Sequence, residues 1–226
     1  MHHVHAHPPH ELSEPPERGE RLSRSERLLE FGAVLLLSFA TLATAWSGYQ
    51  AALFAGEQSQ RYSQSSGLRI HSQNQATKAG QFRIEDLLLF NRWLDAHDSG
   101  NTRLERAYKR RFRARFVPAF RAWIAEHPFT NSRARPSPLY EPQYHPAEVT
   151  RAAVLDREAD KRYEEGTAAK DTDDKYILST VFFAAVLFFS GISLRLEWRP
   201  LRIAVLAFGT TMLLGGLVFV LTLGVA

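Results

Sequence analysis

Hydrophobic and polar residues fall in long blocks along this chain. Three stretches carry no charged residue: residues 31–56, 176–194 and 203–226 supply 26, 19 and 24 uncharged positions. A helix needs about 20 apolar residues to cross ~30 Å of hydrocarbon. The blocks therefore predict three transmembrane helices, over residues 31–56, 175–195 and 201–225.

Two other interpretations of the blocks stay open. Three buried core helices would also be apolar, although core helices rarely run so long without a charge. The first block also contains Ala43-Thr44-Ala45, which fits the cleavage pattern of a secretory signal peptide. About thirty residues precede that block, which is long for such a leader, so a retained span is preferred.

Residues 57–174 are predicted to form an extramembrane helical domain. No proline occurs between Trp46 and Pro118, so residues 57–97 are expected to continue the first span as helix. Gly100 and Asn101 predict a turn before a second helix over residues 102–126, kinked at Pro118. A proline-rich connector follows at 127–146, and a helical pattern resumes from residue 147.

The lengths of these segments predict how they pair. Residues 57–84 and 147–174 would each span about 42 Å as helix. The predicted fold class is therefore all-α, with three transmembrane helices and a long extramembrane helical hairpin between spans 1 and 2. Residues 1–30 are expected to form a disordered, charged and His-rich tail.

Positive charge and aromatic residues give an expected membrane orientation. Arginines precede the first span and fill the turn between the second and third: Arg18, Arg21, Arg24 and Arg27, then Arg195, Arg199 and Arg202. The positive-inside rule places both segments in the cytoplasm, with residues 57–174 on the outer side of the membrane. Four aromatic residues are expected at the membrane interfaces: Trp46, Tyr49, Tyr176 and Trp198.

Small residues recur at a spacing of four in two of the spans. The first span has Ala40, Thr44, Gly48, Ala52 and Gly56, and the third has Ala207, Thr211 and Gly215. Such rows let helix backbones approach closely in lipid. They predict helix–helix interfaces, within the chain or between the subunits of a homo-oligomer.

Residues 58–81 are rich in Gln and Ser and have few large apolar side chains. Packing there must come from hydrogen bonds, small-residue contacts or oligomerisation. A solvated stalk or weak coiled coil is the preferred interpretation. The alternative is a wet vestibule in an oligomer, lined by Gln58, Gln64 and their neighbours.

Residues 102–126 combine a basic face with an aromatic stripe formed by Leu104, Tyr108, Phe112, Phe116, Phe120, Trp123 and Ile124. The stripe could dock on residues 84–94, with the arginines solvated, or the helix could lie on anionic lipid headgroups. Nucleic acid is not expected as a partner, because a net charge of +4 is weak and the domain is expected outside the cytoplasm.

Composition and motifs argue against catalysis. The chain has no cysteine, which excludes disulfides and thiolate chemistry, and no phosphate-binding loop, G-x-S-x-G or H-E-x-x-H motif. Five histidines in residues 1–10 could take up copper or nickel, most simply as an incidental property of a tail. Asp95, His97 and Asp98 are interpreted as a polar helix end. No enzymatic activity, cofactor or metal is expected.

Three features of the sequence resemble those of a known family. They are the segment Trp46-Ser47-Gly48-Tyr49-Gln50-Ala51, the Gln/Ser-rich helix after it, and the terminal helix pair joined by residues 195–199. The chain resembles a family of uncharacterised bacterial inner-membrane proteins with a W-x-x-Y-Q motif after the first span. The resemblance covers about half of the chain and implies membrane location, with no activity or site residues to transfer.

These patterns lead to one functional expectation. The chain is expected to be a non-enzymatic, multi-pass membrane protein that acts as an oligomeric scaffold or interaction module. Its partners would be the lipid bilayer and either further copies of itself or another membrane protein. The alternative is a subunit of an oligomeric channel or transporter with the Gln/Ser-lined vestibule.

Overall fold

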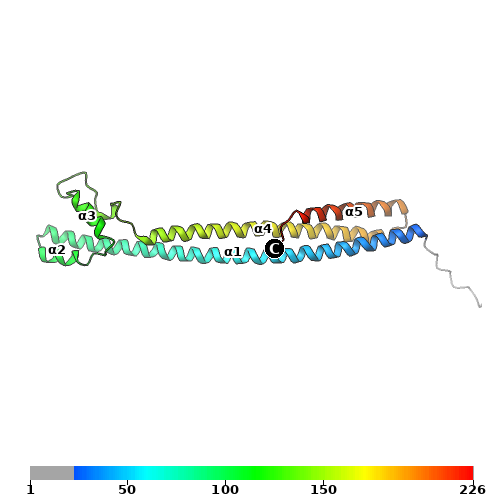
Figure 1. Ribbon diagram of the computed structural model, residues 1–226, viewed down its shortest axis with the longest axis horizontal. Helices are drawn as coiled ribbons and strands as arrows, with labels where there is room; N and C mark the ends of the chain where they lie inside the picture. Colours follow the sequence, from blue (N-terminus) through cyan, green and yellow to red (C-terminus); the bar gives the residue numbers. More distant parts are fainter. Residues whose placement is uncertain (1–22, 226) are drawn as a thin grey trace, which may run out of the picture. The chain divides into compact units, whose positions relative to one another are not determined.

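The computed structural model describes residues 23–225, and over that range its regular secondary structure is entirely helical (Figure 1). Along the chain these are α1 (Arg24–Asp98), α2 (Thr102–Lys109), α3 (Val117–Ala125), the 3₁₀ helix η1 (Pro138–Tyr140), α4 (Ala147–Ser193) and α5 (Arg199–Leu221). The predicted all-α class is confirmed. The histidines of residues 1–10, with Arg18 and Arg21, lie outside the described residues.

Helix α1 runs for 75 residues from the first apolar block into the polar stretch, as expected. It begins at Arg24, so residues 24–30 are helical and do not belong to the tail. A capping box explains this start: the Ser23 amide donates to Glu26 Oε2 at 2.7 Å, and the Glu26 amide donates to Ser23 Oγ at 3.3 Å.

A left-handed glycine ends α1 and turns the chain into α2. Gly100 has φ +68°, and the amide of Asn101 donates to the Ala96 carbonyl at 2.9 Å. The Asn101 side chain then accepts a hydrogen bond from the Leu104 amide at 3.1 Å, which caps the start of α2.

The helix predicted over residues 102–126 is two helices. Helix α2 ends at Lys109, and α3 begins at Val117 with Pro118 in its first turn. Proline is tolerated in the first turn of a helix but interrupts a helix interior. Pro118 is therefore more favourable at the start of a new helix than at a kink within one long helix. The break also lets Phe112 and Phe116 both enter the core.

Helices α1 and α4 contribute to two compact units: unit 1 holds the described residues up to Ala52 and from Thr172 onward, and unit 2 is Leu53–Asp171. Unit 1 is a bundle of the α1 start, the α4 end and α5. Its core is Ala33, Leu36, Ala40, Phe183, Val186, Leu206 and Leu213. Arg199 hydrogen-bonds Ser25, so α1 and α5 start at the same end of the bundle.

Each of the three helices α1, α4 and α5 holds a segment long and apolar enough to cross a membrane. Only 11%, 33% and 28% of these segments are buried inside the protein. Large apolar side chains therefore face outward, among them Phe39, Leu42, Val181, Phe208 and Leu214. An outer surface of this kind suits contact with hydrocarbon chains and is costly in water.

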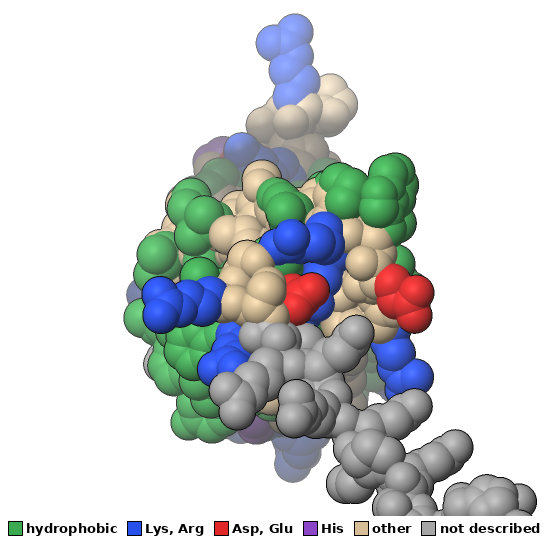
Figure 2. Space-filling view, turned by 90° about the vertical axis from the view of Figure 1, so that its right-hand side faces the viewer, with side chains coloured by type: hydrophobic (Ala, Val, Ile, Leu, Met, Phe, Trp, Pro, Cys, Tyr) green, Lys and Arg blue, Asp and Glu red, His purple; other side chains and the backbone are tan. Residues whose placement is uncertain are grey.

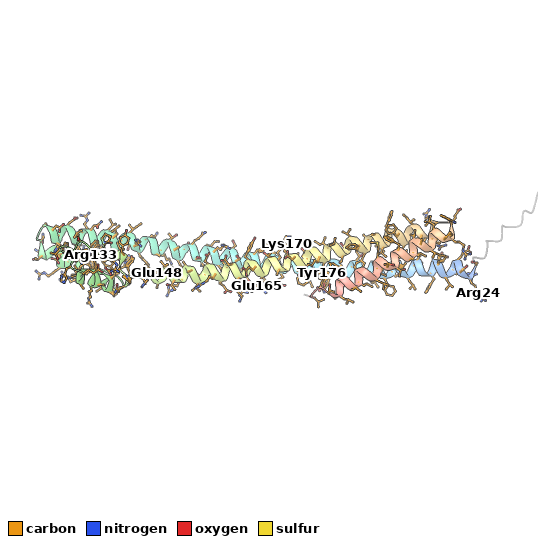
Figure 3. All side chains as sticks on the ribbon, turned by 90° about the horizontal axis from the view of Figure 1, so that it is seen from above. Arg24, Arg133, Glu148, Glu165, Lys170 and Tyr176 are labelled. Atoms are coloured by element: carbon orange, nitrogen blue, oxygen red, sulfur yellow. The ribbon has the colours of Figure 1, made fainter. Side chains whose placement is uncertain are left out.

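In unit 2, α1 and α4 form the predicted hairpin. Arg61, Arg69 and Ser72 of α1 contact Glu165, Asp160 and Ala152 of α4, so the helices run antiparallel. Residues 99–146, called the aromatic head below, pack on the last turns of α1. Figure 3 shows the crowded side chains of the head, with Arg133 labelled, and Glu148 at the start of α4.

Candidate interaction surfaces

The small-residue row of α1 turns from a buried face to an exposed one. Ala40 is fully buried and Thr44 is half-buried, whereas Gly48, Ala52 and Gly56 are exposed. An added Cβ at Gly48 or Gly56 would meet no atom within 4 Å. Each step of four residues advances about 40° around a helix, so the row cannot keep to one face.

Helix α5 packs on α4 through glycines other than the predicted ones. Ala207, Thr211 and Gly215 are exposed. The contact uses Gly209 and Gly216, which are buried. A Cβ at Gly216 would lie 2.8 Å from Phe183 Cε1, and one at Gly209 would lie 3.8 Å from Ser190 Oγ. Their spacing of seven was a signal in the sequence, because seven residues keep the same face.

Three of the four expected interface aromatics are on the surface. Trp46, Tyr49 and Trp198 are exposed. Tyr176 is buried instead, and its hydroxyl donates to the Gly224 carbonyl at 3.0 Å. Tyr176 therefore contacts the segment that follows α5 within unit 1.

Arginines gather at the end of unit 1 where α1 and α5 begin. Figure 2 shows blue Lys and Arg side chains on this face among green apolar ones. Arg24, Arg27, Arg195 and Arg199 are exposed, and Arg202 is half-buried. Acidic side chains, red in Figure 2, lie on the same face. Arginines at the end of an apolar bundle match the headgroup level of an anionic leaflet.

The hairpin of unit 2 packs through small residues, as the Gln/Ser-rich composition required. Its buried positions are Ser65, Ser72 and Ala79 on α1 and Ala159, Gly166 and Ala169 on α4. Ser72 Oγ donates to the Ala152 carbonyl at 2.9 Å. Tyr62 covers Gly166, where a Cβ would lie 2.6 Å from its ring, and stacks on Tyr163. A vestibule in an oligomer stays a prediction.

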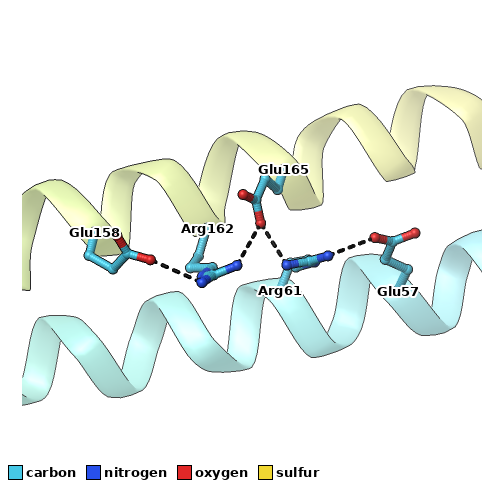
Figure 4. A network of polar contacts seen from close by, with 5 residues as sticks. All are labelled: Glu57, Arg61, Glu158, Arg162 and Glu165. Carbon is cyan, nitrogen blue, oxygen red and sulfur yellow. Dashed lines mark hydrogen bonds and ion pairs between the residues drawn. The ribbon is translucent and has the colours of Figure 1, made fainter.

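Charged side chains join the two hairpin helices (Figure 4). Glu165 accepts from Arg61 at 2.7 Å and from Arg162 at 3.1 Å, while Glu57 and Glu158 bind the same two arginines from the other side. These side chains are partly exposed, so each pair contributes little to stability. Their alternating order favours one register of the hairpin over others.

The aromatic stripe of the head is docked on α1. Phe112, Phe116, Phe120 and Trp123 are buried against Phe90 and Trp93. Trp93 meets the Phe120 ring edge-on with ring centroids 4.7 Å apart. The stripe is therefore not free to insert into lipid, and its docking on α1 is confirmed. The expectation that the arginines are merely solvated is wrong for Arg113 and Arg115, which pair with Glu85 and Glu148.

Two arginines of the head hold a single aromatic ring between cationic groups. The guanidinium carbons of Arg113 and Arg115 each lie 4.2 Å from the Phe82 ring centroid. Arg115 also binds Glu148 at 2.6 Å, and this hydrogen bond lowers the pKa of the Glu148 carboxyl. Arg113 pairs with Glu85.

A buried carboxyl lies beside these arginines. Asp86 is 1% exposed and accepts the Tyr144 hydroxyl at 3.0 Å. Desolvation raises the pKa of Asp86, and burial with the neighbouring Asp86 charge raises the pKa of Tyr144. The sequence alone did not reveal this pair, although Asp86 shares a helix face with Phe82, Phe90 and Trp93.

The Asp95/His97/Asp98 cluster is a structural helix end. His97 is stacked between the rings of Trp93 and Phe129, with centroids 5.3 and 4.6 Å away, and its Nδ1 lies 3.7 Å from Glu105. Asp95 and Asp98 are exposed. Within residues 23–225, no three His, Asp or Glu side chains are grouped so that they could hold a metal ion.

Comparison with known proteins adds no family to this description. No protein-family model, no curated protein and no solved structure matches the chain. Functional conclusions therefore depend on the geometry of the two units.

Proposed function

We propose that the chain is a non-enzymatic, multi-pass protein of the bacterial plasma membrane that forms homo-oligomers and presents unit 2 as an interaction module. The exposed small face of α1 carries this proposal. The buried face of α1 already packs on α4 and α5 through Ala33, Leu36 and Ala40. Gly48 and Ala52 are left facing outward, where a second helix could approach closely.

The proposed orientation follows the arginines at the starts of α1 and α5. Placing this end in the cytoplasm satisfies the positive-inside rule for two short segments at once. Unit 2 would then lie on the outer side of the membrane. Protease cleavage within residues 127–146 in intact spheroplasts tests this orientation, and protection of these residues until lysis would reverse it.

Substitution of the exposed glycines tests the oligomer. Gly48→Leu and Gly56→Leu place bulk on the proposed interface without a clash inside one chain, because each Cβ points into open space. Crosslinking in detergent is expected to yield oligomers from the parent protein and monomers from both variants. Gly191→Leu is a matched control, since a Cβ at Gly191 also meets nothing within 4 Å. Oligomers that persist in both variants would refute this interface.

A further inference from the structure

We propose that a cleft in unit 2 binds a small apolar carboxylate. The cleft lies between α1, the residues around η1 and the start of α4, and its volume is about 430 Å³. This is within the usual range of small-molecule sites. Its lining is Ala76, Ala79, Gly80 and Arg83 from α1, Leu139, Tyr144, His145 and Pro146 from the connector, and Val149, Thr150 and Ala152 from α4.

Small residues on both helices create the hollow. Ala76, Ala79 and Gly80 face Ala152 across the cleft, so neither helix fills it with a long side chain. A Cβ on Gly80 would meet no atom within 4 Å, which confirms that space is free there. Buried Leu139 contributes an apolar wall from the head.

The charge of the cleft is positive. None of its lining residues is acidic, and its one guanidinium belongs to Arg83. Arg83 is exposed, and its guanidinium carbon lies 5.9 Å from the centroid of the Tyr140 ring. It forms no ion pair with any carboxylate of residues 23–225. Helix α4 begins at the same edge, so the positive end of its dipole adds to the field.

The nearby carboxylates are already engaged. Asp86 accepts the Tyr144 hydroxyl behind the cleft wall, and Glu148 is bound by Arg115. Arg83 is therefore left to pair with an anion from outside. One guanidinium matches one carboxylate through two parallel hydrogen bonds. The alanine and leucine lining suits an apolar body attached to that group.

Ligand-observed ¹⁹F NMR on the full chain in neutral-lipid nanodiscs tests this site. The probes are 4-(trifluoromethyl)benzoate and its uncharged amide, 4-(trifluoromethyl)benzamide, with empty nanodiscs as the baseline. The benzoate is expected to bind more tightly than the amide. Arg83→Gln is expected to weaken benzoate binding by at least about tenfold and to leave the amide unchanged, because it removes only the charged hydrogen bonds.

Two further variants separate the cleft from general effects. Gly80→Leu fills the hollow and is expected to abolish binding of both probes, with helix content checked by circular dichroism. Arg92→Gln removes an exposed arginine of the same helix outside the cleft and is expected to change nothing. Equal binding of benzoate and amide, no binding of either, or benzoate binding that survives Arg83→Gln would overturn the proposal.

Discussion

Gly166 is the residue at which the hairpin has least room. An added Cβ would lie 2.6 Å from the Tyr62 ring, and that ring cannot move freely because it stacks on Tyr163 with centroids 5.1 Å apart. Gly166→Ala is therefore expected to destabilise the protein by about 1–3 kcal/mol, the usual cost of overpacking, despite the better helix propensity of alanine. Thermal unfolding followed by circular dichroism in detergent measures this.

Gly67→Ala is the matched control for that substitution. Gly67 lies in α1, and a Cβ there would meet nothing within 4 Å. This variant gains the helix propensity without the clash, so its Tm should equal or exceed that of the parent. Equal shifts of Tm in the same direction in both variants would contradict the close contact between Tyr62 and Gly166.

Asp86 and Glu148 are expected to affect stability with opposite pH dependence. Burial raises the pKa of Asp86, so its contribution is full at acid pH and is lost as pH rises through the raised value. The bond from Arg115 lowers the pKa of Glu148, so its contribution is present above the ordinary value and lost as pH falls. The stability differences between the parent and the uncharged variants Asp86→Asn and Glu148→Gln should therefore change with pH in opposite directions.

A pH series of thermal unfolding checks this for Asp86→Asn and Glu148→Gln. Relative to the parent, the Tm of Asp86→Asn should rise as the pH increases above the ordinary aspartate value of about 3.8. The Tm deficit of Glu148→Gln should be full above about pH 4.5 and should shrink as the pH falls below that value. Differences that do not vary with pH in either variant would show that these carboxyls are not perturbed in the way the contacts indicate.

The sequence revealed that small residues matter but did not show which ones pack within the chain. The row from Ala40 to Gly56 looked like one face because its spacing is regular. A helix repeats at 3.6 residues, so a spacing of four drifts while the seven-residue spacing of Gly209 and Gly216 does not. Gly216 and Gly166 are essential because the rings of Phe183 and Tyr62 lie against them. These contacts can be seen only in the folded structure.

At the scale of elements, α5 has two adjacent glycines, Gly215 and Gly216, of which only Gly216 packs on α4. Gly216 is buried under Phe183, and Gly215 is exposed with nothing within 4 Å of an added Cβ. Gly216→Leu is expected to lower the free energy of unfolding by about 1–3 kcal/mol. Gly215→Leu is expected to change it by no more than about 0.5 kcal/mol.

Thermal unfolding of the two variants in the same detergent compares them directly. The pair is well matched because the substitutions are identical and lie one position apart on α5. Equal loss of stability in both variants would contradict the register in which Phe183 meets Gly216.

Segment lengths predicted the hairpin, because residues 57–84 and 147–174 match and the polar α1 has no proline to end it. The break at residues 110–116 was not predicted. The periodicity of the aromatic stripe continues across it, and only the contacts with Phe90 and Trp93 show that two short helices bury the stripe better than one. Tertiary packing determined this element, as is common for short helices.

At the scale of the whole molecule, three stretches without charge predicted the three apolar helices, because apolar length is a direct consequence of membrane thickness. The described chain divides into two units, of which unit 1 has an apolar exterior and unit 2 has an aromatic core with charged surfaces. The sequence could not assign the cleft at Arg83, since its lining comes from three segments separated along the chain.

The central claim is that lipid covers the outer face of unit 1. The chain has no cysteine, so single cysteines can report on each position without background. Leu42, Val181 and Leu214 are 67%, 61% and 59% exposed, so water would reach cysteines there if no bilayer covered them. Ser66, exposed on the polar hairpin, provides the accessible control.

Labelling of Leu42→Cys, Val181→Cys, Leu214→Cys and Ser66→Cys with a water-soluble maleimide in open membrane fragments is the most direct test. Rapid labelling is expected at position 66, and labelling at positions 42, 181 and 214 only after the protein is denatured in hot SDS. Rapid labelling of all four positions without denaturation would contradict the central claim, because the apolar helices would then face water.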